Sequence, residues 1–229
     1  MKCLILAGGF STRMYPLTIN RAKALLEYKD KPVINHIVGK IPPNIDILIS
    51  INRKFETDFR IWQQRIDRQV ELLIEQASSE DQKLGAVSSL NYWVENKSIA
   101  DDLLVIAGDN YFEFDITQFM SEYDGDHTLV AVYDIGNRDK ASQFGVLRLE
   151  GRKIIELQEK PAVPKSSLVA TACYIFPQRA LPLLTEYCRQ GKRDNLGSFI
   201  AYLIGHAEVH AYTFSKLWLD IGSMDDLVQ

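Results

Sequence analysis

Four short apolar runs alternate with helical patterns in the first half of the chain, and this alternation constrains the fold more than any other feature. The apolar runs lie at 2–7, 45–51, 70–75 and 103–107. The helical patterns lie at 32–41, 55–66 and 82–94. Strands that alternate with helices in this way form βαβ units and a parallel sheet covered on both faces. The sequence therefore predicts an α/β fold with an open, mostly parallel, Rossmann-like sheet flanked by helices.

The second half of the chain is less regular. Strands are predicted at 128–135, 169–176 and 209–214, with a hairpin between 145–149 and 153–157. Pro177 is expected to open a helix that ends near Gln190, and Asp194 to cap one that ends near Gly205. Because no linker separates the halves, we expect a single domain over 1–229, with hairpin and helix insertions in its second half.

Composition narrows the classes of partner. The 229 residues are 46% hydrophobic and 24% charged, which is typical of a globular protein. A net charge of −4 argues against a nucleic-acid partner, because domains that bind nucleic acid usually carry a basic face. No apolar stretch approaches the ~20 residues that span a bilayer, and no signal-peptide pattern is present, so no membrane partner is expected. The three cysteines are odd in number and predict reduced thiols in a cytoplasmic protein.

The segment that follows the first apolar run has the composition of an anion-binding loop. Ligands of open α/β sheets bind beyond the carboxyl ends of the strands, where this segment lies. Gly8 and Gly9 allow close approach of the backbone, Ser11 and Thr12 carry hydrogen-bond donors, and Arg13 presents a planar fork suited to phosphate. The segment matches neither G-x-x-x-x-G-K-[ST] nor G-x-G-x-x-G. A bound phosphate group is one interpretation, and a tight turn with a surface arginine is the other.

The residues from Leu6 to Thr18 resemble the signature L-A-G-G-x-G-T-R-L-x-P-L-T of the sugar-1-phosphate nucleotidyltransferases, which include glucose-1-phosphate thymidylyltransferase and UTP–glucose-1-phosphate uridylyltransferase. The match departs at Ser11, where these enzymes have glycine. Similar motifs recur in the family's order at Lys23-Ala24-Leu25-Leu26, Leu84-Gly85-Ala86, Gly108-Asp109-Asn110, Phe144-Gly145-Val146, Glu159-Lys160-Pro161 and Trp218-Leu219-Asp220-Ile221-Gly222. Ala86 stands where the family has threonine, and Ala172 or Cys173 where it has glycine.

The resemblance implies the nucleotide-diphospho-sugar transferase fold and a role for each matching residue. Nucleotide binding is implied for Leu6, Gly8, Gly9, Ser11, Thr12, Gln76 and Gly85. Binding of the second substrate is implied for Asn110, Gly145, Glu159, Tyr174 and Trp218. Catalytic roles are implied for Arg13, Lys23 and Lys160, and Mg²⁺ ligation for Asp109 and Asp220. Residues 1–110 would then mainly bind the nucleotide, and residues 111–229 the sugar phosphate.

The implied reaction is an in-line attack of a sugar 1-phosphate on the α-phosphorus of an NTP, with dTTP or UTP favoured, releasing pyrophosphate. Because the nucleophile is already an anion, positioning and fixed cations suffice. Two alternatives stay open: a cytidylyl- or guanylyltransferase that acts on another phosphate, such as a heptose phosphate or phosphocholine, and a non-catalytic subunit that binds a nucleotide or sugar phosphate. A homo-oligomer is compatible with the sequence. Because the chain ends at Gln229, we expect no C-terminal β-helix domain.

Overall fold

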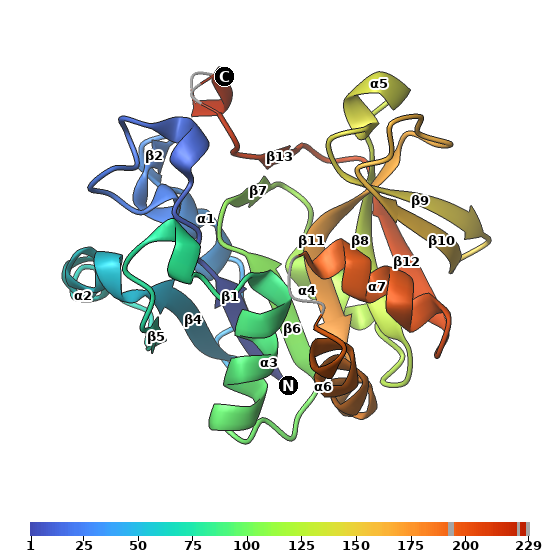
Figure 1. Ribbon diagram of the computed structural model, residues 1–229, viewed down its shortest axis with the longest axis horizontal. Helices are drawn as coiled ribbons and strands as arrows, with labels where there is room; N and C mark the ends of the chain where they lie inside the picture. The colour runs from blue at the N-terminus through green and yellow to red at the C-terminus, as the bar shows by residue number, and fades with distance from the viewer. Residues whose placement is uncertain (192–194, 224, 228–229) are drawn as a thin grey trace.

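The computed structural model describes residues 1–191, 195–223 and 225–227, and its centre is a nine-stranded sheet (Figure 1). The first half contributes β1 (Lys2–Leu6), β4 (Asp46–Asn52), β5 (Glu71–Glu75) and β6 (Leu103–Ala107). The second half contributes β8 (Thr128–Asp134), β9 (Gly145–Glu150), β10 (Lys153–Glu159), β11 (Leu168–Phe176) and β12 (Val209–Phe214). The spatial order is β5-β4-β1-β6-β11-β8-β12-β10-β9. One sheet therefore runs through both halves of the chain.

The first half of the sheet is parallel, as the alternation predicts. β1 lies between β4 and β6, and β5 flanks β4. Alternate residues of β1 enter separate cores on the two faces of the sheet. Cys3 and Ile5 pack on the face that α1 (Val33–Val38) and α2 (Glu56–Gln63) cover, and Leu4 packs on the face of α3 (Ala86–Asn96). Burial on both faces explains why these strands are continuously apolar.

The second half makes the sheet mixed rather than mostly parallel. β11 runs antiparallel to β6 and β8, and β9 and β10 form the predicted antiparallel hairpin. Parallel pairing returns only between β8 and β12. The difference arises because these strands are joined by a hairpin and by long connections rather than by successive βαβ crossovers.

The helices differ from the predicted ranges at both their starts and their ends. The helix expected at 82–94 begins at Ala86, because Gly85 has a φ of 87° and stands before the first turn. The helix expected at 32–41 is α1, which begins after the strand β3 (Lys31–Pro32) beside β2 (Glu27–Tyr28) and ends three residues earlier than predicted. The remaining helices are α4 (Ile116–Ser121), α5 (Arg138–Ala141), α6 (Leu181–Arg189) and α7 (Leu196–Ile204). None of the helices in the described ranges is long and apolar enough to cross a bilayer.

The capping residue expected for the last helix, Asp194, lies outside the described residues. Asn195 is the N-cap of α7, and its side-chain oxygen accepts the backbone N–H of Ser198 at 2.7 Å. An amide oxygen in this position satisfies one of the free donors of the first turn.

A separate two-stranded sheet at the top of Figure 1 joins the middle of the chain to its last strand. β7 (Asn110–Phe112) pairs antiparallel with β13 (Trp218–Asp220), with Asn110 opposite Asp220. The backbone N–H of Ile221 also donates to the carbonyl oxygen of Asp109 at 3.1 Å. This pairing brings the two predicted metal ligands, which are far apart in sequence, to one place.

Candidate active site

A cleft of about 550 Å³ lies beyond the carboxyl ends of β1 and β6 and is lined by both halves of the chain. Most of the residues that the sequence singles out line it: Leu6, Gly8, Gly9, Gly85, Asp109, Asn110, Gly145, Glu159, Lys160, Tyr174, Trp218 and Asp220. The structure thus places residues from separate motifs around one cavity large enough for a small-molecule ligand.

Five predicted residues do not line the cleft: Ser11, Thr12, Arg13, Lys23 and Gln76. Arg13 is exposed on a short 3₁₀ turn, Thr12–Met14, and is near enough for its charge to act on Asp220. Gln76 is exposed beyond the end of β5, whereas its neighbour Glu75 faces the cleft. Successive side chains of an extended strand point to opposite sides, so Glu75 rather than Gln76 points into the cleft.

Asp109, Asp220 and Lys23 form a charged group at the β7–β13 junction. The Lys23 ammonium nitrogen lies 2.7 Å from Asp109 Oδ2 and 3.9 Å from Asp220 Oδ1. Desolvation, followed by the nearby charge of Asp109, raises the pKa of Asp220 to about 6, while Lys23 and Arg13 oppose that rise. Two neighbouring carboxylates, one of them largely withdrawn from water, suit a cation such as Mg²⁺, which prefers oxygen ligands.

On the first-half side of the cleft, Glu75 is a buried carboxylate that sequence reasoning missed. Its Oε1 accepts hydrogen bonds from the hydroxyls of Ser50, at 2.5 Å, and Ser89, and Trp93 Nε1 donates to the Ser50 hydroxyl at 2.7 Å. A Cβ on Gly8 would lie 3.4 Å from the same oxygen. Glu75 is thus fixed by its neighbours, and Oε2 is the oxygen that the two hydroxyls do not use. The sequence signal that could have identified Glu75 as a site residue is a charged residue directly after the apolar run of β5.

Both positions where the sequence lacks a family glycine adopt left-handed backbone. Ser11 has a φ of 51° and Ala172 a φ of 53°. The Ser11 carbonyl accepts the hydroxyl of Thr18 at 2.7 Å, and Ala172 lies where the pairing of β11 with β8 shifts register. A non-glycine residue pays roughly 1–2 kcal/mol in this region. The backbone shape that glycine favours is therefore kept without glycine, at a cost in stability.

On the second-half side, Glu159 is held between two glycines. Burial raises the pKa of Glu159, and the adjacent Lys160 charge opposes the rise. A Cβ on Gly145 would lie 3.1 Å from Glu159 Oε2, and a Cβ on Gly197 of α7 would overlap that oxygen. Any larger residue at 197, a position that sequence reasoning missed, would make the Glu159 carboxylate move from this position. The place of Gly197 in the first turn of a helix, where glycine has no capping use, was the available signal.

Asn110 and Trp218 join the two halves. The Asn110 amide nitrogen donates to the Thr171 carbonyl of β11, and Trp218 Nε1 donates to the Asn110 side-chain oxygen at 3.3 Å. Both polar groups of Asn110 therefore make hydrogen bonds inside the protein that position β7, and its predicted contact with substrate stays a prediction. Lys160 is exposed, and its backbone N–H donates to the Phe144 carbonyl at 2.9 Å, which places its side chain at the cleft.

An α/β sheet with aspartates, lysines and a glycine loop around one cleft defines a protein that handles phosphate-bearing ligands. The family model described as Nucleotidyl transferase matches residues 2–229, and the chain belongs to that family.

Known proteins agree with this assignment. A protein of Sulfolobus acidocaldarius provisionally named mannose-1-phosphate guanyltransferase is 26% identical over 100% of this chain and 62% of its own length. The bifunctional protein GlmU of Methanocaldococcus jannaschii is 29% identical over 100% of this chain and 53% of its own. The chain thus spans between half and two thirds of the length of these relatives.

A crystal structure gives the same result for the fold. It is that of a Bacillus anthracis protein, provisionally described as a glucose-1-phosphate thymidylyltransferase, in complex with sucrose. The TM-score is 0.86 at 27% identity, over 100% of this chain and 92% of the other. The expected nucleotide-diphospho-sugar transferase fold is therefore confirmed.

Proposed function

We propose that this chain transfers a nucleotidyl group from an NTP to a sugar 1-phosphate, giving an NDP-sugar and pyrophosphate. The observation that carries the proposal is the pair Asp109 and Asp220, held beside Lys23 where the two halves of the cleft meet. When bound there, Mg²⁺ would neutralise charge on the phosphate oxygens. The proposed single domain then divides its substrates, with the NTP on residues 1–110 and the sugar phosphate on residues 111–229.

The basic side chains supply the remaining charge. Arg13, beside Asp220, would stabilise the departing pyrophosphate. Lys23 would turn from Asp109 toward the α-phosphate once a cation takes over that carboxylate. Lys160, at the opposite side of the cleft, would hold the incoming sugar phosphate, and the fixed Glu159 would accept hydrogen bonds from sugar hydroxyls. No protein nucleophile is required, because the sugar phosphate oxygen attacks directly.

Glu75, the last residue of β5, supports GTP as the nucleotide substrate in place of the dTTP or UTP that the resemblance implies. A carboxylate only accepts hydrogen bonds. Guanine offers adjacent N–H donors on its pairing edge, whereas uracil and thymine offer one N–H between two carbonyl oxygens that a carboxylate would repel. A good bidentate contact discriminates between bases by about 1–3 kcal/mol. Glu75 lines the cleft and is held by Ser50 and Ser89 through Oε1, so its Oε2 would accept the N–H groups of guanine.

The test is a matrix of NTPs against sugar 1-phosphates and phosphocholine, read by pyrophosphate release with Mg²⁺. We expect release with sugar 1-phosphates, fastest with GTP, and none with Asp109→Asn. Pyrophosphate release with phosphocholine but with no sugar 1-phosphate would support the alternative of a cytidylyl- or guanylyltransferase that acts on another phosphate. NTP binding without release for any acceptor would support the non-catalytic subunit. The expected cytoplasmic location stays a prediction.

A further inference from the structure

A second cluster of ligand-type side chains lies away from the cleft. Asp124 precedes β8, His127 immediately precedes that strand, and His210 is on the neighbouring β12. β12 begins beside this cluster, and its other end leads to β13, whose Trp218 lines the cleft. The cluster therefore occupies the opposite end of the same strand, and none of its members lines the cleft.

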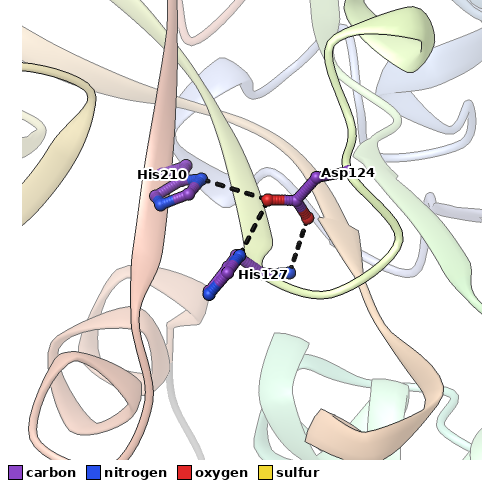
Figure 2. A group of neighbouring side chains, drawn as sticks. All are labelled: Asp124, His127 and His210. Carbon is purple, nitrogen blue, oxygen red and sulfur yellow. Dashed lines mark hydrogen bonds and ion pairs between the residues drawn. The ribbon is translucent and has the colours of Figure 1, made fainter.

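The two imidazoles converge on one carboxylate oxygen (Figure 2). The Nδ1 atom of His127 is 2.7 Å from Asp124 Oδ2, and the Nδ1 atom of His210 is 3.5 Å from the same oxygen. The three ligand atoms lie within 4.8 Å of one another, and the rings stack at a centroid distance of 4.5 Å. Among the residues that the structure describes, this is the one group of three potential metal ligands found.

The surrounding groups fix the orientation of each ligand. Asp124 Oδ1 accepts the backbone N–H groups of Asp126 and His127, each at 2.8 Å, so that Oδ2 faces the imidazoles. Glu208 Oε1 lies 2.8 Å from His210 Nε2, and Lys153 holds the other oxygen of Glu208 at 3.1 Å. A carboxylate on the far nitrogen of a histidine is the arrangement that orients metal-bound imidazoles.

We propose that Asp124, His127 and His210 bind a divalent transition metal of the zinc type. Two imidazole nitrogens and one carboxylate oxygen suit zinc and exclude Mg²⁺ and Ca²⁺, which take oxygen ligands. Ligand atoms around one tetrahedral zinc lie ~3.3 Å apart. The distance from His210 Nδ1 to Asp124 Oδ2 is already close to this value, and the distance from His127 Nδ1 to the same oxygen would lengthen slightly when the metal binds. Asp124 is exposed, which leaves the fourth position to water or an added ligand.

Such a metal would tie the segment before β8 to β12. The strand pairing of β8 with β12 begins just after this segment, at Thr128 and Val209. The site is remote from Asp109 and Asp220, so its occupation would change stability and leave turnover unchanged. A metal-free cluster of ion pairs is the competing account, and it predicts no uptake of zinc.

The experiment uses the full chain, stripped with EDTA and titrated with Zn²⁺ in excess Mg²⁺ by calorimetry and thermal unfolding. We expect one Zn²⁺ per chain and a higher unfolding midpoint. His127→Asn and His210→Asn should each weaken binding about tenfold or more and abolish the midpoint shift. His206→Asn, an exposed histidine outside the cluster, and the double variant Asp109→Asn with Asp220→Asn should bind as the original chain does.

Nitrogen NMR of the imidazoles in the unaltered chain keeps the test independent of how the variants fold. Zn²⁺ should shift the Nδ1 signals of His127 and His210 and leave those of His36 and His206 unchanged. The absence of uptake, uptake that survives both histidine variants, or uptake lost with the cleft aspartates would each overturn the proposal.

Discussion

The two sides of the cleft come from differently built halves of the molecule. The first side lies at the ends of parallel strands and presents backbone at Gly8 and Gly9 with one fixed carboxylate, Glu75. The second side lies on antiparallel strands and presents the side chains of Glu159 and Lys160. In the proposed function, the local βαβ units of the first side would hold the nucleotide, and the strand pairs from distant segments on the second side would hold the sugar phosphate.

The largest expected effect comes from the junction of the two sides. Asp109→Asn keeps the side-chain volume and removes the charge that Lys23 contacts and that Mg²⁺ would need. Loss of several kcal/mol of charge stabilisation corresponds to a fall in kcat of about a thousandfold or more. Pyrophosphate release at saturating Mg²⁺ measures it, with the exposed Asp67→Asn as a matched control. Turnover within a few-fold of the original chain would remove Asp109 from the metal site.

The strands of the first half could be predicted from the sequence because each is marked by a pattern within its own short segment. The parallel strands β1, β4 and β6 are continuous apolar runs, each close to the ranges predicted. The β7–β13 pair was not readable, because two three-residue strands separated by most of the second half carry no periodicity of their own. The motif resemblance, rather than any pattern, brought Asp109 and Asp220 together in the prediction.

The sequence placed the cleft residues least well where two neighbouring polar residues point to opposite sides of a strand. Gln76 was expected in the cleft and Glu75 lies there, because side chains alternate along the strand and the sequence does not fix which of two polar neighbours faces inward. Gly197 was missed because its neighbours Glu159 and Leu157 lie on β10 rather than on its own helix.

The next largest effect tests whether Arg13 serves the first side of the cleft. Arg13→Ala should lower kcat about a hundredfold to a thousandfold, the usual cost of losing one group that stabilises developing charge. The KM for the sugar phosphate should stay unchanged, because that substrate is assigned to the other side. Steady-state kinetics in both substrates separates the two parameters. A variant altered only in sugar-phosphate KM would move Arg13 to the second side.

We expect a moderate effect on the free energy of unfolding from Asp220, whose carboxyl is partly buried beside Asp109. Its carboxyl has a pKa of about 6 in the folded chain against an ordinary 3.8, so ionising it opposes folding. That penalty is absent below pH 3.8, grows between 3.8 and 6, and is complete above. Asp220→Asn, measured by denaturant unfolding in EDTA, should therefore gain stability over the original chain at pH 7.5, with the gain shrinking toward pH 5. A gain that grows as the pH falls would contradict this origin.

The smallest effect compares two left-handed positions, Ser11 in the loop after β1 and Ala172 on β11. Ser11→Gly and Ala172→Gly should each raise the free energy of unfolding by about 1 kcal/mol, because glycine adopts a positive φ without the clash. Ser215 is exposed and does not have a positive φ, so Ser215→Gly should instead lower the free energy of unfolding slightly. Chemical denaturation gives all three values. A loss at either left-handed position would mean that its side chain stabilises the loop or bulge by more than the strain costs.

The division of substrates between the two sides is tested most directly by one set of kinetics on Glu75→Gln and Lys160→Ala, with Lys165→Ala as control. For each variant, the ratio of kcat/KM for GTP over UTP and the KM for the sugar phosphate are measured together. We expect Glu75→Gln to lower the ratio by roughly fivefold to 150-fold, the equivalent of about 1–3 kcal/mol, with the sugar-phosphate KM unchanged. Lys160→Ala should raise that KM and leave the ratio unchanged. If either variant changed both quantities to the same extent, the two sides would not divide the substrates, and the account would be contradicted.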